Sequence, residues 1–367
     1  MPQAASARSS FVRHRSAIGL AAFVIVTIAL LIAFAPARRA GAVLSELDVT
    51  RPLPTHIPPG IVLRIGDPVT QWVFQHLGWE KDLPFRIQWE QVTGGPDVTE
   101  ALHAGALDVG LGASVPPIHA AWMGIPVRIV ALRTYADPAH HQAWVFGISP
   151  RANIRGIADL RGKRIAFSPS QVQAVVILET LRAAGLKPAD VTLVELPSSI
   201  GGDVYANALA SAEVDAAPLA AGIVAERYLR KFGRDGARLL RHPPFRDDVL
   251  NVYVPESALA DPAKAAALRL YASYWGRAQA WINAHPEAFA QGYYATHQGL
   301  PIDDARLIVA ATGKFDVPAD WSHARRVEQA AIDLLGPQAG RPHIDADSLF
   351  DPRFERIAAD AAKGKSS

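Results

Sequence analysis

The sequence predicts an α/β protein of two lobes, followed by a helical section near the C-terminus. Two observations predict it. From about residue 60 to about residue 250, short apolar strands alternate with helices of roughly 10–15 residues, which is typical of parallel βαβ units. These units form two successive sets, 60–146 and 147–248, after which a strand near residue 250 returns to the first set. A chain that leaves one lobe and comes back has two crossovers, which can act as a hinge beside a ligand crevice.

The first lobe is organised around residues 88–117, where strands twice lead through small residues into helices. The first of these strands ends near Val92, and the Gly94-Gly95 turn follows it. Pro96 opens the next helix and Gly105 ends it, which is the expected asymmetry of proline at helix starts and glycine just after helix ends.

A second short strand, Leu107–Leu111, runs through Ser114 to a helix that opens at the Pro116-Pro117 pair. A helix start has unpaired backbone N–H groups and the positive end of the helix dipole, so it suits acceptor atoms of a ligand. Two such starts close together in the chain indicate the site of a receptor rather than that of an enzyme.

The remaining elements follow the same alternation. The first lobe should also contain a helix, Val69–Leu77, with Asp67 as its N-cap. Its other expected strands are Ile61–Ile65, Phe85–Trp89, Val127–Leu132 and Ala143–Ile148. The strands expected in the second lobe are Arg164–Phe167, Thr192–Leu196, Val214–Ala217 and Leu239–Leu240. Its expected helices are Gln171–Ala184, Val204–Ser211 and one that Pro218 opens and that ends near Phe232.

The last section, 249–355, should return to the first lobe through a strand at Val249–Val254 and continue as helices from Pro262 to about Leu335. Apolar side chains recur there at a helical spacing, which predicts a face buried in the core rather than a cofactor site. They are Leu268, Trp275, Ile282 and Phe289. The final residues, 356–367, are expected to form a tail.

Composition excludes several functions. The net charge of the 367 residues is +2, so nothing indicates a nucleic-acid partner. Cysteine is absent, which excludes disulfides, thiolate catalysis and a lipid-modified cysteine anchor. His140 and His141 are adjacent, and neighbours on an extended chain usually point apart, so we expect no metal and no cofactor. There is no Gly-x-Ser-x-Gly, phosphate-binding or HExxH motif, so we expect no catalytic residues.

The N-terminus predicts export. Residues 1–15 are basic, residues 16–37 carry no charge and are mostly apolar, and residues 38–59 form a proline-rich linker. The apolar stretch is long enough to span a bilayer, and it reads as an uncleaved signal anchor or as a cleaved signal peptide. In either case the body of the protein is placed outside the cytoplasmic membrane.

Several segments resemble a known family and recur in its order. They are Leu63–Gly66, Val92–Asp97, Glu100–Gly110, Pro116-Pro117, Ile157–Phe167, Ala278–Ile282 and His285–Glu287. Across roughly residues 60–295 the chain resembles the periplasmic substrate-binding proteins of ABC importers for aliphatic sulfonates, taurine and nitrate. The resemblance implies a type II, Venus-flytrap periplasmic-binding-protein fold that delivers a small ligand to a membrane permease and its ATPase.

The resemblance also implies that three loops hold the acidic group of the ligand: Thr93-Gly94-Gly95, Gly112-Ala113-Ser114-Val115 and Ser168-Pro169-Ser170-Gln171. From the residues themselves, the hydroxyl and N–H groups of these loops can donate to an oxyanion, and glycine permits close backbone approach. The alternative is that the serines only cap helices. The candidate ligand residues are Gln71, Thr93, Gly94, Gly95, Ser114, Val115, Arg133, Ser168, Ser170 and Gln171.

Two of these candidates, Gln71 and Arg133, and the neighbouring Asp67 lie at the first-lobe edge, and their roles are open. Gln71 lies in the first turn of its helix and could line the crevice. Arg133 and Tyr135 follow a strand end in a polar loop, where Arg133 could pair with a sulfonate or carboxylate, or be a solvated surface arginine. Asp67 is either a helix cap or a pocket carboxylate, and in the pocket it would favour an amine, as in a zwitterion such as taurine.

We therefore expect an extracytoplasmic, monomeric solute-binding protein for a small anionic or zwitterionic ligand. The alternative is a membrane-tethered sensor, or a binding protein or enzyme of precursor metabolism (thiamine pyrimidine type) on the same fold.

Overall fold

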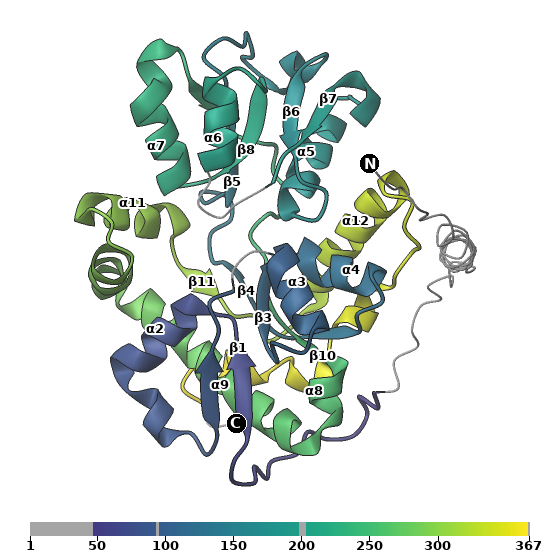
Figure 1. The fold of residues 1–367 in the computed structure, drawn as a ribbon, viewed down its shortest axis with the longest axis vertical. Helices are drawn as coiled ribbons and strands as arrows, with labels where there is room; N and C mark the ends of the chain where they lie inside the picture. The colour runs from purple at the N-terminus through teal and green to yellow at the C-terminus, as the bar shows by residue number, and fades with distance from the viewer. Residues whose placement is uncertain (1–46, 93–94, 198–202, 366–367) are drawn as a thin grey trace, which may run out of the picture. The chain divides into compact units, whose positions relative to one another are not determined.

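The computed structural model describes residues 47–92, 95–197 and 203–365, which contain two separate groups of strands (Figure 1). In the first lobe, β1 (Val62–Ile65) and β2 (Arg86–Trp89) pair in parallel. A second sheet has the order β11-β4-β10-β3. Its strands are β3 (Gly110–Ala113), β4 (Val127–Tyr135), β10 (Leu250–Pro255) and β11 (Phe315–Asp316). A parallel bridge between Ile65 and Val109 connects β1 to the β3 side of this sheet.

Helices follow the strands of the first lobe as the sequence predicts. They are α2 (Pro68–Leu77), η1 (Trp79–Asp82), α3 (Gly95–His103) and α4 (Val115–Trp122). Asp67 caps α2, because its side chain accepts a hydrogen bond from the Thr70 N–H at 3.0 Å. The predicted N-cap is therefore confirmed.

The second lobe has a five-stranded sheet of order β7-β6-β8-β5-β9. Its strands are β5 (Trp144–Ile148), β6 (Arg164–Phe167), β7 (Thr192–Glu195), β8 (Ala216–Ala220) and β9 (Arg238–Leu240). Its helices and short turns are η2 (Ile157–Leu160), α5 (Val172–Ala183), η3 (Pro188–Asp190), α6 (Asp203–Ala210), α7 (Ile223–Phe232) and η4 (Gly233–Asp235). β6 runs parallel to β7 and β8, whereas β5 runs antiparallel to β8 and β9.

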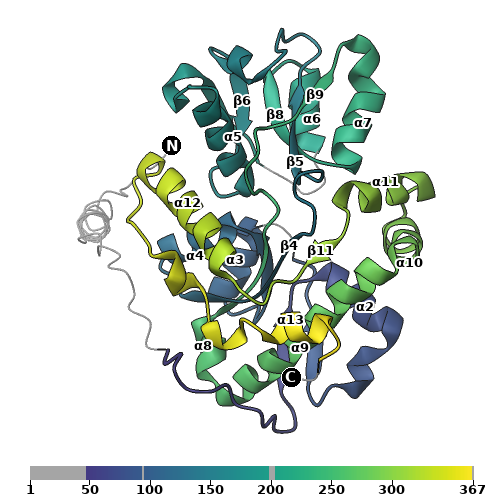
Figure 2. The same cartoon turned by 180° about the vertical axis from the view of Figure 1, so that it is seen from behind.

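The C-terminal section is mostly helical and packs on the first lobe (Figure 2). It contains α8 (Glu256–Ala260), α9 (Pro262–Ala284), α10 (Pro286–Phe289), the π-helix η5 (Ala290–His297), α11 (Ile302–Thr312), α12 (Ser322–Gln338), η6 (Ala346–Leu349), η7 (Pro352–Phe354) and α13 (Ile357–Ala362). The four apolar residues predicted to share one face, Leu268, Trp275, Ile282 and Phe289, are all buried. The prediction that this stripe belongs to the core is confirmed.

Four sequence predictions are wrong in detail. The strand expected at Ala143–Ile148 in the first lobe is β5, which pairs with β8 and β9 in the sheet of the second lobe. Residues 356–367, expected as a tail, contain α13, which packs against α9.

Pro218 does not open a helix, since it lies inside β8, opposite Phe146 of β5. Proline has no backbone N–H to donate to a neighbouring strand. The strand tolerates Pro218 because β8 pairs with β6 only at Ala216, so β6 needs no hydrogen bond from residue 218. Arg133 and Tyr135 do not lie in a loop, because β4 continues to Tyr135 and pairs there with the short strand β11, which the sequence did not predict.

The described part of the N-terminal linker, residues 47–59, is extended, and the half-buried Leu47, Leu53 and Ile57 pack against the main core. The predicted signal anchor, 16–37, lies outside the described residues. Within 47–92, 95–197 and 203–365, no helix is both long and apolar enough to cross a bilayer.

Candidate functional site

The strands of the first lobe end at one edge, and the predicted ligand residues follow those ends. β3 and β4 both pair antiparallel with β10, so they run in the same direction, and the bridge between Ile65 and Val109 shows that β1 does too. In open α/β sheets, ligands bind outside the carboxyl ends of the strands. Ser114 follows β3, and Arg133 lies near the end of β4, so both stand at this edge.

The register places Ser114 and Arg133 relative to each other. Leu250 of β10 is the cross-strand partner of Ala113 on one side and of Arg133 on the other. Because neighbouring strands lie about 4.8 Å apart, the backbones of Ala113 and Arg133 are roughly 10 Å apart along this row.

Gly95 connects the three predicted loops. A Cβ atom added to Gly95 would lie 2.6 Å from Pro116 Cγ and 3.5 Å from Gln171 Oε1. The start of α3, the start of α4 and the loop before α5 are therefore in close proximity, although Gln171 belongs to the second lobe. Only glycine leaves room for this approach. Thr93 and Gly94, the other candidates of the first loop, lie outside the described residues.

The hydroxyl of Ser114 does not cap α4. A capping serine accepts a hydrogen bond from the N–H of the second or third helical residue, and in α4 these are Pro116 and Pro117, which have none. Ser114 is also helical itself, with φ −60° and ψ −40°. The capping alternative is therefore wrong for Ser114, and the two prolines are a signal in the sequence that could have excluded it. Ser114 is 5% exposed, and its hydroxyl forms no hydrogen bond within the described chain.

The loop Ser168–Gln171 provides the start of α5. Gln171 is the N-cap of this helix, and its side chain makes no capping hydrogen bond. Ser168 is buried and Ser170 half-buried, and neither hydroxyl has a partner among the residues that the structure describes. These hydroxyls are free to donate to an acceptor.

Two other candidates, Val115 and Gln71, have side chains that already make contacts within the protein. The Val115 side chain is fully buried in the core, so only its backbone N–H can reach a ligand. Gln71 is half-buried, and its Oε1 accepts a hydrogen bond from Gln91 Nε2 at 3.2 Å. This contact places Gln71 beside the end of the segment that leads to the Thr93–Gly95 loop.

Arg133 is not a solvated surface residue, so that alternative is wrong. It is half-buried, its Nη1 donates to Gln279 Oε1 at 2.5 Å, and its guanidinium lies 3.5 Å from the centre of the Phe315 ring. Burial lowers its pKa, while the neighbouring Tyr135 and Asp67 favour its charged form. Arg133 is thus a cation held at the sheet edge.

Asp67 is buried beside Arg133, with 2% of its surface exposed. Burial raises the pKa of its carboxyl group. Since its Oδ1 is used in capping α2 and the side chain has almost no exposed surface, the geometry favours the cap over a pocket carboxylate.

Sequence reasoning missed the residues that surround Arg133. Phe315 and Tyr294 come from β11 and from η5, and the two-residue strand and the π-helix have no recognisable sequence pattern. The adjacent histidines do point apart, as predicted. His140 Nδ1 is 2.8 Å from Asp137 Oδ2, whereas His141 Nδ1 is 2.9 Å from the Ala311 carbonyl oxygen.

The two crossovers between the lobes lie side by side. The Gln142 side chain donates to the His242 carbonyl at 3.1 Å. Two buried carboxylates of the second crossover also accept backbone N–H groups of the first: Asp247 from Trp144 at 2.9 Å, and Asp248 from Tyr135 at 2.5 Å. These bonds hold the two connections together as a paired hinge.

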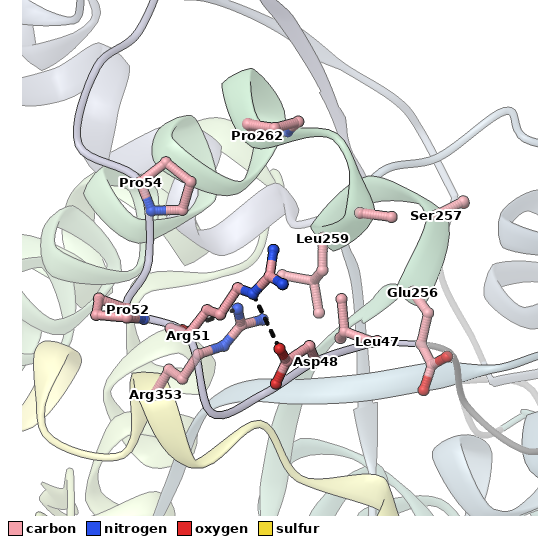
Figure 3. Close-up of a pocket in the computed structure, with 11 residues that line it drawn as sticks. Leu47, Asp48, Arg51, Pro52, Pro54, Glu256, Ser257, Leu259, Pro262 and Arg353 are labelled. Atoms are coloured by element: carbon pink, nitrogen blue, oxygen red, sulfur yellow. Dashed lines mark hydrogen bonds and ion pairs between the residues drawn. The ribbon is translucent and has the colours of Figure 1, made fainter.

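A pocket of about 460 Å³ lies elsewhere, between the extended N-terminal segment and α8 (Figure 3). Asp48 and Arg51 form an ion pair of 3.0 Å there, and the Arg353 side chain donates to the Arg51 carbonyl at 3.5 Å. None of the predicted ligand residues lines it.

Parts of the chain match a known family and a known protein in sequence. Residues 73–234 match the family model described as NMT1/THI5 like. An Escherichia coli (strain K12) protein named as an aliphatic sulfonates-binding protein is 32% identical over 106 residues, which are 29% of this chain and 32% of that protein. The match thus spans about a third of the length of that relative.

Solved structures agree over most of the chain. The alkanesulfonate-binding protein SsuA from Xanthomonas axonopodis pv. citri, bound to MOPS, has a TM-score of 0.65 at 21% identity, covering 80% of this chain and 98% of that one. The periplasmic aliphatic sulphonate binding protein SsuA from Escherichia coli also has a TM-score of 0.65, at 20% identity, covering 80% and 92%. The resemblance noted in the sequence is confirmed. The chain has the two-lobed fold of the periplasmic binding proteins, and its residues 73–234 carry the sequence pattern of the NMT1/THI5-like family.

Proposed function

We propose that this protein is the extracytoplasmic solute-binding component of an ABC importer. It would capture a small anionic or zwitterionic ligand of the sulfonate, taurine or nitrate type between its lobes and deliver it to a permease and its ATPase. The N-terminal segment, residues 16–37, would direct the body to the outer side of the cytoplasmic membrane.

One observation carries the proposal. Ser114 is a largely buried residue at the start of α4 whose hydroxyl cannot cap that helix. The start of α4 is close to the start of α3 at Gly95 and to Gln171 of the second lobe. Hydroxyl and N–H donors gathered from two lobes form a site for an oxyanion. The names of the sulfonate-binding relatives support a sulfonate as the acidic group.

Isothermal titration of the full chain with ethanesulfonate, taurine and nitrate tests the proposal. We expect at least one of them to bind. The double variant Ser114→Ala, Ser168→Ala should weaken that binding by roughly 1–3 kcal/mol, because two donors to a charged acceptor are lost.

Ser211→Ala is the matched control. The Ser211 hydroxyl already donates to the Ala208 carbonyl at 3.2 Å, at the end of α6, and its loss should leave affinity unchanged. Equal affinities of the double variant and the control would show that the serines do not contact the ligand. Failure of the protein to bind any of the anions would overturn the proposed function.

A further inference from the structure

Arg133 differs from most arginines that are shielded from solvent in this protein. Except for Arg269, the other buried or half-buried arginines in the described part of the chain are paired with carboxylates. The pairs are Arg64 with Asp108, Arg128 with Glu256, Arg246 with Asp248, Arg325 with Asp347 and Arg353 with Asp351. Arg133 has no carboxylate within 4.0 Å in the described chain, and its one side-chain hydrogen bond there is to Gln279. A shielded guanidinium with unused donors is suited to an acidic or acceptor group from outside the protein.

Aromatic side chains surround this arginine. Phe315 lies under its guanidinium and is the cross-strand neighbour of Tyr135, with the two ring centres 6.1 Å apart. His141 packs edge-on against Tyr135 at 6.4 Å. Tyr294 packs edge-on against Phe289, with ring centres 5.3 Å apart, and its nearness favours the charged form in the pKa of Arg133. We call Arg133, Tyr135, His141, Tyr294 and Phe315 the Arg133 cluster. All five are half-buried, and neither tyrosine hydroxyl has a hydrogen-bond partner among the described residues.

The position of Tyr294 depends on an unusual element. It belongs to the π-helix η5, and such segments are rare and often occur at functional sites. Gly292 fits this segment against Trp72, because a Cβ atom at Gly292 would lie 2.4 Å from Trp72 Cζ2. The wider turn thus sets the direction in which the aromatic side chains of η5 point.

The Arg133 cluster is displaced from the oxyanion donors at Ser114. Ala113 and Arg133 are both paired with Leu250, so their backbones are roughly two strand spacings, about 10 Å, apart. A sulfonate that is bound at the start of α4 and carries only a two-carbon chain would extend less far toward the cluster. A flat ring attached to the same sulfonate would extend toward the aromatic side chains and the cation.

We propose that the ligand is an aromatic sulfonate, with its sulfonate at the helix starts and its ring against the Arg133 cluster. The inference rests on the proposed function and specifies its ligand class. Tyr135, His141 and Tyr294 provide ring faces and edges for stacking, and Arg133 provides a cation next to the π system.

Titration of the full chain with benzenesulfonate and with ethanesulfonate tests the inference, since the two probes share their acidic group. We expect benzenesulfonate to bind about tenfold more tightly or better, from ring burial and aromatic contacts. Tyr294→Ala should reduce the affinity for benzenesulfonate about tenfold while changing that for ethanesulfonate less than about twofold. Tyr294→Phe keeps the ring and should retain the preference, and Ser114→Ala should weaken both probes alike.

Ethanesulfonate binding as tightly as benzenesulfonate to the unaltered protein would overturn the inference and leave the proposed function standing. An equal loss for both probes in Tyr294→Ala would also overturn it. If neither sulfonate binds, and taurine and nitrate do not either, the proposed function fails and the inference fails with it.

Discussion

Glu328 is a residue whose environment controls its charge. It is fully buried on α12, and its Oε1 accepts a hydrogen bond from Asn251 Nδ2 at 2.7 Å. Its Oε2 and Asn251 Oδ1 are both without a hydrogen-bond partner in the described chain. Burial raises the pKa of Glu328 to about 8, so the side chain is mostly protonated near neutral pH. A protonated carboxyl group can donate as well as accept, which suits a facing amide.

We predict that Glu328→Gln removes a pH dependence of stability. The native pKa of about 8 lies above the ordinary value of 4.5, so between these pH values the folded state binds more protons than the unfolded state. This contribution to stability is complete below pH 4.5 and is lost as pH rises to about 8. Glutamine mimics the neutral acid and does not titrate. The free energy of unfolding of the variant should therefore match that of the unaltered protein at pH 5 and exceed it by a few kcal/mol at pH 8. Urea unfolding at pH 5, 6.5 and 8 measures this, and a constant difference across the three would contradict it.

At the scale of elements, the order of strands and helices could be predicted from the sequence because each has its own local pattern and caps. Asp67 before Pro68 identifies the start of α2 without any tertiary information. The strand containing Pro218 could not be recognised, because proline favours a helix start locally, and only the limited pairing of β6 with β8 makes the strand possible. The limit is tertiary context overriding a local preference.

The candidate site likewise has a part that the sequence predicts and a part that it does not. The loops around Gly95, Ser114 and Ser168 follow strand ends, so their positions could be predicted. The surroundings of Arg133 could not be, since Phe315 and Tyr294 come from elements far along the chain. The extra residue per turn in η5 also shifts the face on which Tyr294 lies relative to an α-helix.

The packing of α9 against α13 depends on one glycine. A Cβ atom at Gly276 would lie 2.0 Å from the carbonyl oxygen of Ala358, a backbone atom that cannot turn away. We predict that Gly276→Ala destabilises the protein by about 1–3 kcal/mol, because forced separation of the helices outweighs the roughly 1 kcal/mol gained in helix propensity. Gly156→Ala is the control, since Gly156 is extended with nothing within 4 Å of an added Cβ. Chemical unfolding compares the two variants, and equal stabilities would show that α13 can shift at little cost.

At the scale of the whole molecule, the described parts of the lobes meet away from the hinge at two places besides the approach of Gly95 to Gln171. On one side, Val172, Val175 and Leu178 of α5 share a core cluster with Ile332 and Leu335 of α12. On the other side, the largely buried Asp304 of α11 accepts a hydrogen bond from Arg230 of α7 and lies 3.9 Å from Arg227. The first contact is apolar and insensitive to salt, whereas the second is an ion pair at a partly exposed position. Both favour the arrangement in which Gly95 and Gln171 are close.

We predict that Asp304→Ala shifts the protein toward an open arrangement and weakens ligand binding. The apparent affinity is the affinity of the closed form multiplied by the fraction of molecules that are closed. A partly exposed ion pair contributes up to about 1 kcal/mol to closure, so the affinity should fall about two- to fivefold. Because salt screens this ion pair, the difference from the unaltered protein should shrink at high ionic strength. Asp303→Ala is the matched control. The Asp303 carboxylate is next to Asp304 in the sequence, but it is 93% exposed and lies 3.9 Å from Arg306 of the same helix. Titration at low and high salt, with small-angle X-ray scattering of the ligand-free proteins, would separate the two. Identical affinities and radii of gyration for both variants would mean that the apolar contact between α5 and α12 is sufficient for closure.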